Sequence, residues 1–147
     1  MKFGWLLLIV PALGCSESKV TDVTSDTTHN SISVSGPLRF AVTDFSTQAG
    51  VLWALPSITP AVGAVEVENT RYGSLCRFDV TGRAETQGNK IDLFVQFDER
   101  LSLCTAEIRA LRYTAIISEP PGTYDVTVIH RDGTSVDTLR RQTVAVR

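Results

Sequence analysis

Hydrophobic and polar residues alternate in short runs along most of the chain. In the stretch LRFAV the apolar side chains of Leu38, Phe40 and Val42 fall on one face, and valine alternates with glutamate through residues 65–68. A period of two residues is typical of strands that bury one face, whereas helical periodicity is scarce here. The pattern therefore predicts one all-β domain over residues 36–147.

The clearest alternation is CRFDVTGRAETQGNKIDLFVQFD, residues 76–98. Apolar side chains occupy every second position on both sides of TQGN, which predicts a β-hairpin in which Gly88 and Asn89 are available for turn conformations that disfavour most side chains. Phe94 falls on the polar face of this hairpin. An exposed aromatic side chain on a sheet is a candidate binding surface, and burial of Phe94 under a second sheet or a loop is the alternative.

Residues 113–128, YTAIISEPPGTYDVTV, join two apolar alternations through a Pro-Pro-Gly corner. This arrangement is similar to the penultimate strands of fibronectin type III and other immunoglobulin-like domains. The resemblance implies an antiparallel β-sandwich of about seven strands, in which Tyr124 occupies the tyrosine corner and its hydroxyl bonds the upstream backbone. Closure into a barrel is the alternative. The preceding stretch TAEIRALR, residues 105–112, is either a helix or a loop that enters the next strand.

The first residues predict an export signal. Lys2 supplies a positive charge, and residues 3–10 form an unbroken apolar run, far shorter than the ~20 residues of a membrane-spanning helix. The formal net charge of the whole chain is −2, and its basic residues form no cluster. Nucleic acid is therefore not an expected partner, because its phosphates demand clustered Lys and Arg.

The apolar run ends in ALGC, residues 12–15, which resembles the lipobox of bacterial lipoproteins, although Ala12 stands where Leu is more usual. The resemblance implies a signal peptide over residues 1–14, a lipid on Cys15 and the membrane as a partner. Ser16 after the cysteine then implies sorting to the outer membrane. Ordinary secretory cleavage at the same place is the alternative, and it leaves Cys15 as a free thiol.

A polar segment rich in Ser and Thr follows the lipobox-like motif. Only Val20 and Val23 are apolar between residues 16 and 31, so this segment lacks the apolar surface that would offset its ordering entropy. We expect a flexible tether over residues 15–35.

The chain has three cysteines, and an exported protein tends to pair its thiols because its compartment is oxidising. If the turn of the hairpin centres on Gln87 and Gly88, Cys76 lies opposite the neighbourhood of Glu99, and Cys104 follows at the same end of the sheet, so the two sulfurs are within reach of each other. A disulfide between Cys76 and Cys104 would contribute about 3.5 kcal/mol by restricting the unfolded chain. This pairing leaves Cys15 over for the lipid.

No sequence motif for nucleophilic, metal or phosphate chemistry is present, so we predict no catalytic residue, no metal and no cofactor. His130 follows the inward positions of its strand but adjoins a turn, and we expect a partly exposed strand-end residue rather than a catalytic base. Asp79, Asp92 and Asp98 fall on the outward face of their strands, where solvated surface is the ordinary role.

These features predict a non-enzymatic, lipid-anchored protein of the bacterial cell envelope that presents a β-sandwich for binding or structural adhesion. An envelope protein or a carbohydrate is the expected partner besides the membrane. One alternative is an exported hydrolase that uses surface carboxylates, which would show two facing acids in a cleft. The other is a secreted soluble β-sandwich with a free Cys15.

Overall fold

The computed structural model describes residues 29–35, 37–46, 54–101, 103–104 and 108–147. These residues form nine β-strands and no helix. The strands are β1 (His29–Ser35), β2 (Leu38–Ser46), β3 (Ser57–Ala61), β4 (Ala64–Tyr72), β5 (Phe78–Gln87), β6 (Lys90–Glu99), β7 (Arg109–Ser118), β8 (Gly122–Asp132) and β9 (Ser135–Val146). Within this part of the chain no helix is a candidate membrane span.

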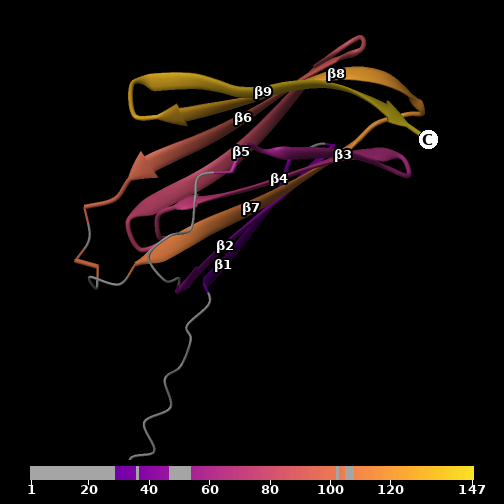
Figure 1. The fold of residues 1–147 in the computed structure, drawn as a ribbon. Helices are drawn as coiled ribbons and strands as arrows, with labels where there is room; N and C mark the ends of the chain where they lie inside the picture. The colour runs from indigo at the N-terminus through magenta and orange to yellow at the C-terminus, as the bar shows by residue number, and fades with distance from the viewer. Residues whose placement is uncertain (1–28, 36, 47–53, 102, 105–107) are drawn as a thin grey trace, which may run out of the picture.

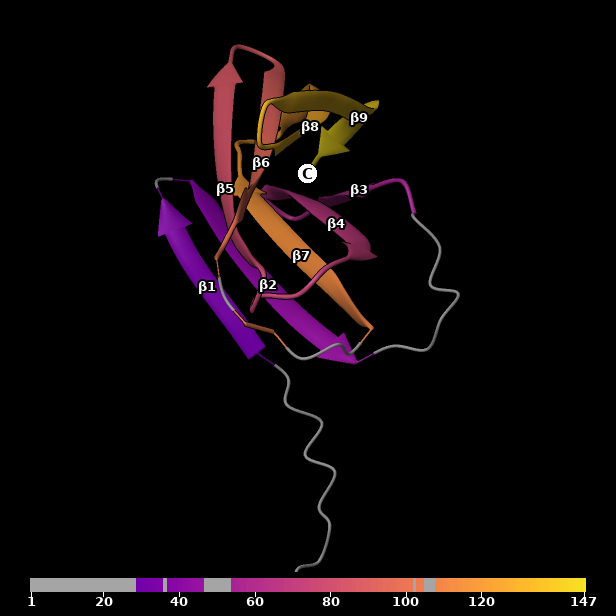
Figure 2. The ribbon, with the colours of Figure 1, turned by 90° about the vertical axis from the view of Figure 1, so that its left-hand side faces the viewer.

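The strands form two sheets that face each other as the layers of a sandwich (Figure 1). The first sheet has five strands in the order β1-β2-β7-β4-β3, and the second has four in the order β5-β6-β8-β9. Figure 2 shows β1 and β3 at opposite edges of the first sheet, with β7 between them. The predicted all-β sandwich is therefore confirmed, and the two sheets are separate rather than closed into one barrel.

Two details of the predicted sandwich are wrong. The described residues contain nine strands rather than about seven. The second sheet is not wholly antiparallel, because β6 and β8 pair in parallel, with Phe94 opposite Ile129. The reason is the path of the chain: after β6 it crosses to β7 in the other sheet and returns to β8, so β6 and β8 run in the same direction. The other strand pairs are antiparallel, as are the sheets of immunoglobulin domains.

The core lies between the sheets and is built from the alternating apolar positions. Leu38, Phe40 and Val42 are each at most 2% exposed, which confirms the face predicted for them. The same holds for the inward residues of the other long strands, among them Val65, Val67, Ile91, Leu93, Val95, Phe97, Tyr113, Ala115, Ile117, Val126 and Val128. Removing this apolar surface from water supplies the main favourable term for folding.

Three boundaries differ from prediction. Residues 29–35, expected in the tether, form β1, because their alternating sequence HNSISVS pairs with the free edge of β2. Residues 109–112 begin β7 and are not helical, while residues 105–107 lie outside the described residues. The β5–β6 turn consists of Gly88 and Asn89, the two residues expected to favour it, since Gln87 pairs with Lys90 and Gly88 has φ of 61°. Its centre lies one residue later than the Gln87–Gly88 centre used to place Cys76 opposite Glu99. The predicted signal peptide and Cys15 also lie outside the described residues.

Candidate functional site

The predicted disulfide is present between Cys76 and Cys104, with a Cα–Cα distance of 5.9 Å. It joins the chain just before β5 to the chain that follows β6. A buried carboxylate holds the neighbouring loop: Asp44 accepts hydrogen bonds from the Ser74 hydroxyl at 2.8 Å and from the Leu75 amide at 2.9 Å. The bridge and this carboxylate therefore order the same end of the sandwich.

Asp44 itself was not singled out from the sequence. It is 0% exposed and forms an ion pair with Arg109 at 3.1 Å across the β2–β7 pair. A signal was available, because Asp44 continues the inward phase of Leu38, Phe40 and Val42. A carboxylate in that phase requires a charged partner or several donors, which here come from β7 and from the loop after β4.

The hydroxyl of Tyr124 donates a hydrogen bond to the backbone carbonyl of Pro120 at 3.0 Å. This is the upstream backbone bond that the tyrosine-corner resemblance implies. Tyr124 is 8% exposed, and its ring belongs to the hydrophobic core. The tyrosine thus closes the corner between β7 and β8 from the inside.

Phe94 lies on the outer face of the second sheet, because its neighbours Leu93 and Val95 point into the core. Its ring is half-buried and is flanked by two guanidinium groups, that of Arg83 at 4.9 Å and that of Arg131 at 5.4 Å from the ring centroid. Arg83 lies directly opposite Phe94 on β5, and Ile129 lies opposite it on β8. We call Arg83, Phe94, Ile129 and Arg131 the aromatic–arginine face.

The charges of this face are incompletely compensated. Arg83 forms an ion pair with Glu85, whereas Arg131 has no ion-pair partner among the described residues. Asp92 lies two residues before Phe94, on the same face of β6. It lines a hollow of about 200 Å³ together with Lys90, Asp125, Thr127 and Arg141. Arginine over an aromatic ring keeps donors free for carboxylate or phosphate oxygens, so this face can bind anionic groups beside an apolar surface.

The acids proposed for a hydrolase lie on this outer side as well. Asp79 is directly opposite Asp98 in the β5–β6 pair, and both are exposed. Asp79 forms an ion pair with Arg100, and Asp98 accepts a hydrogen bond from the Gln96 amide at 2.9 Å. No group of three metal-ligating side chains occurs in the described part of the chain.

His130 is buried rather than partly exposed, so the prediction for it is wrong. Its side chain is 7% exposed, and its Nε2 lies 2.8 Å from the hydroxyl of Tyr113. The His130 ring packs edge-on against the rings of Phe97 and Tyr113, with centroid distances of 5.2 and 5.5 Å. The alternation of inward and outward side chains in β8 continues to His130, near the end of the strand. Tyr113 from the opposite sheet packs against the His130 side chain there.

Burial lowers the pKa of His130 to about 4, and the positive charge of Arg71 acts in the same direction. The carboxylates of Asp137 and Asp132 oppose this shift. Burial also raises the pKa of the Tyr113 hydroxyl far above its ordinary value. At neutral pH both members of this buried pair are therefore uncharged.

A cavity of about 230 Å³ adjoins His130 between the two sheets. We call it the inter-sheet pocket; it is lined by Ala54, Leu55, Asn69, Arg71, His130, Asp132, Asp137 and Leu139. Arg71 forms an ion pair with Asp132 at 3.0 Å, and its guanidinium lies 4.1 Å from the centroid of the Phe97 ring. Sequence periodicity offered no signal for this pocket, because its lining comes from three strands and a connecting segment.

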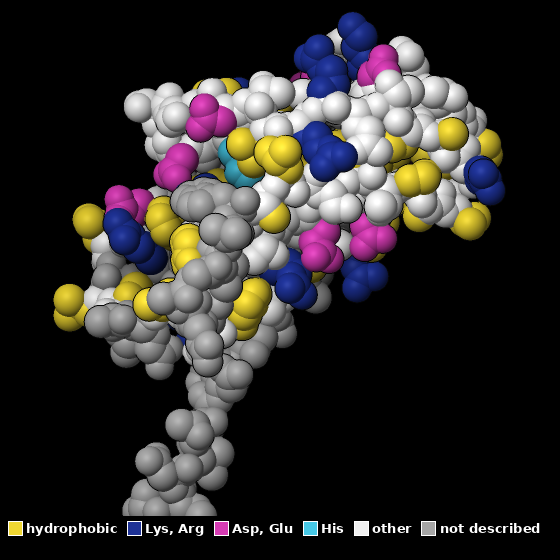
Figure 3. Space-filling view, viewed as in Figure 1, with side chains coloured by type: hydrophobic (Ala, Val, Ile, Leu, Met, Phe, Trp, Pro, Cys, Tyr) yellow, Lys and Arg dark blue, Asp and Glu magenta, His cyan; other side chains and the backbone are white. Residues whose placement is uncertain are grey.

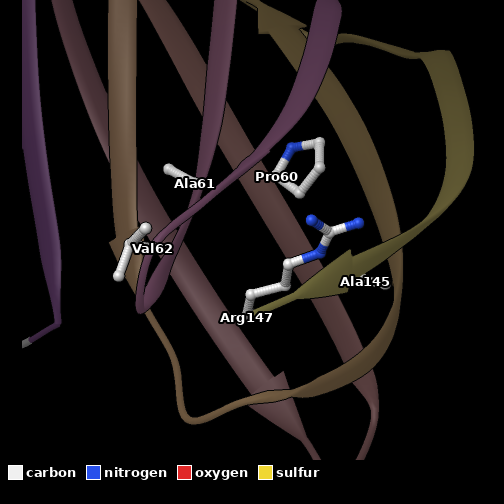
Figure 4. Close-up of a pocket in the computed structure, with 5 residues that line it drawn as sticks. All are labelled: Pro60, Ala61, Val62, Ala145 and Arg147. Carbon is white, nitrogen blue, oxygen red and sulfur yellow. The ribbon is translucent and has the colours of Figure 1, made fainter.

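A third hollow, of about 480 Å³, lies where the β3–β4 hairpin meets the end of β9. Figure 3 shows hydrophobic side chains beside a basic one at this end of the molecule, and further hydrophobic, acidic and basic side chains interspersed over the rest of the visible face. In Figure 4 the Arg147 guanidinium reaches below Pro60, while Val62 points away from it at the hairpin tip. The lining offers one charged side chain and few polar groups, so it lacks the converging donors and acceptors of a specific ligand site.

Comparisons with protein-family models, with curated proteins and with solved structures found no match for this chain.

Proposed function

We propose that this protein is a non-enzymatic, lipid-anchored component of the bacterial cell envelope that uses the aromatic–arginine face to bind an acidic envelope polysaccharide. The observation that carries the proposal is the position of Phe94 between Arg83 and Arg131 on the outer face of the second sheet. The ring offers apolar surface to a sugar ring, and the guanidinium of Arg131, which has no ion-pair partner among the described residues, is available to bind a carboxylate in bidentate geometry. A partner bearing carboxylates on a sugar backbone fits both features.

The lipid anchor is the second part of the proposal and rests on the lipobox-like motif at residues 12–15. A lipid on Cys15 would hold the domain at the membrane, most simply the outer membrane, given Ser16. The intact mass of the protein purified from its native membrane tests this: we expect a chain that starts at Cys15 and carries acyl groups. An unmodified chain starting at Cys15 would instead make it a secreted protein with a free thiol.

The binding role is tested by titrating the full-length protein with polygalacturonate, an acidic polysaccharide, and with neutral dextran at low ionic strength. We expect saturable binding of polygalacturonate alone, weakening as salt is added because the attraction is electrostatic. Arg131→Gln should weaken it by about fivefold, corresponding to about 1 kcal/mol for one exposed charged contact. Arg77→Gln is the matched control, since Arg77 is also exposed but pairs with Glu99 outside this face. Equal effects of the two substitutions would refute the assignment of the face.

A further inference from the structure

The inter-sheet pocket combines apolar walls with polar groups that lack partners. Asn69 is 4% exposed and donates its amide to the Ala54 carbonyl at 2.6 Å, but its Oδ1 has no hydrogen-bond partner among the described residues. Leu55 and Leu139 supply apolar lining. This oxygen is not sealed in the core, and without a donor among the described residues it is available to accept a hydrogen bond from a molecule in the pocket.

His130 supplies the complementary donor. Tyr113 is 1% exposed, and within the described residues the only acceptor near its hydroxyl is His130 Nε2. The hydroxyl hydrogen would be orphaned unless it is donated to Nε2, so the proton of the neutral imidazole sits on Nδ1. Nδ1 has no partner in the described part of the chain, and His130 lines the pocket. The lining of the pocket therefore includes an N–H donor from His130 as well as the Asn69 acceptor.

The charge of the pocket is negative. Its charged residues are Arg71, Asp132 and Asp137. Arg71 and Asp132 neutralise each other in an ion pair, while Asp137, directly opposite His130 in the β8–β9 pair, has no ion-pair partner among the described residues. One uncompensated carboxylate at the rim favours a cation. A metal ion fits poorly, because the described residues contain no group of three metal ligands.

We infer that the inter-sheet pocket binds a small organic ammonium ion, whose ammonium group meets Asp137 and Asn69 Oδ1 and whose apolar body lies against Leu55 and Leu139. A hydroxyl or carbonyl oxygen on that body accepts the hydrogen bond from His130 Nδ1. The volume of about 230 Å³ lies below the roughly 300–1,000 Å³ of pockets for drug-sized ligands, so the molecule is of the size of an arylalkylamine. This site is separate from the aromatic–arginine face, which lies on the outer side of the second sheet.

Tyramine is the probe, because it joins an ammonium group to an apolar ring with one hydroxyl. The full-length protein is titrated with tyramine and with 4-hydroxyphenylacetate, which has the same ring and a negative charge, while the ring resonances of His130 are followed by NMR. We expect saturable shifts with tyramine at millimolar concentration or below, a Kd of about 1 mM being ordinary for so small a ligand. The anion should bind at least about fivefold more weakly.

Asp137→Asn is the decisive variant, because Asp137 is exposed and has no ion pair whose loss would unfold the described structure. It should weaken tyramine binding by about fivefold, whereas the control Asp98→Asn, at an aspartate that is also exposed but lies on the outer face of β6, should leave it unchanged. The inference is overturned if tyramine gives no saturable shift, if the anion binds as tightly, or if both substitutions act alike.

Discussion

At the scale of single residues, His130 is a base that the fold keeps uncharged. It is buried between the aromatic rings of Phe97 and Tyr113, with the Arg71 guanidinium nearby, and its pKa is lowered to about 4. In the unfolded chain the same imidazole has an ordinary pKa near 6.5. Between these two values the unfolded chain binds a proton that the folded protein does not.

Stability should therefore fall as the pH is lowered from about 6.5 towards 4, and the contribution of His130 to this loss is about 3 kcal/mol. Urea unfolding at a series of pH values measures it. His130→Gln keeps an acceptor for Tyr113 but does not titrate, so the stability advantage of the wild type over this variant should shrink as the pH falls. A constant difference between the two proteins from pH 7 to pH 4 would contradict the assigned burial effect.

At the scale of elements, the two sheets approach each other closely where β5 meets β2. A Cβ atom on Gly82 of β5 would overlap the ring of Phe40 on β2. Phe40 is 1% exposed and stacks on Tyr113, with a ring-centroid distance of 5.6 Å, so the ring has little room to move. Glycine at residue 82 is thus a requirement of sheet-to-sheet packing.

Gly82→Ala should destabilise the protein by about 1–3 kcal/mol, although alanine in place of glycine within a strand otherwise stabilises by roughly 0.5–1 kcal/mol. Denaturant unfolding checks the sign. Combining the substitution with Phe40→Leu should recover part of the loss contributed by Gly82→Ala, because the smaller side chain leaves space for the methyl group. Thr81→Ala, on the exposed face of the same strand, is the control and should change stability by no more than about 0.5 kcal/mol. A stabilising Gly82→Ala would mean that the sheets can move apart freely.

At the scale of the whole molecule, the disulfide limits the unfolded chain more than it shapes the folded one. Cys76 and Cys104 are separated by 28 residues, and the closed loop contains the whole β5–β6 hairpin. Replacing both cysteines by serine should lower the free energy of unfolding by about 3.5 kcal/mol in the loop-entropy model. Urea unfolding of this variant, and of the reduced wild type, measures the loss. A decrease in the free energy of unfolding of less than about 1 kcal/mol in both proteins would show that the hairpin already closes the loop in the unfolded state.

Much of this fold follows from local sequence. Several of the long strands show their inward face in their own alternation of apolar and polar residues, as for Phe40 in β2 and Val126 in β8, because the side-chain period of a strand is two residues whatever its partner. The β5–β6 hairpin was predictable for the same reason, since a glycine marks the turn between two alternating segments. Cys76 and Cys104 could then be paired by geometry alone. The position of Phe94 on the outer face of its strand was likewise predictable. Its contacts with Arg83 and Arg131 were not, because they depend on how β5 and β8 pair with β6.

Only the tertiary structure decided how the elements combine. The parallel pairing of β6 with β8 depends on β7 leaving for the other sheet, and no local pattern encodes that path. The burial of His130 likewise depends on side chains contributed by distant strands. The inter-sheet pocket has the same origin, since Asn69 and Asp137 come from opposite sheets. Periodicity is a property of neighbouring residues, whereas strand order and pockets arise from contacts between residues far apart in the chain, and these are set by the packing of the whole core.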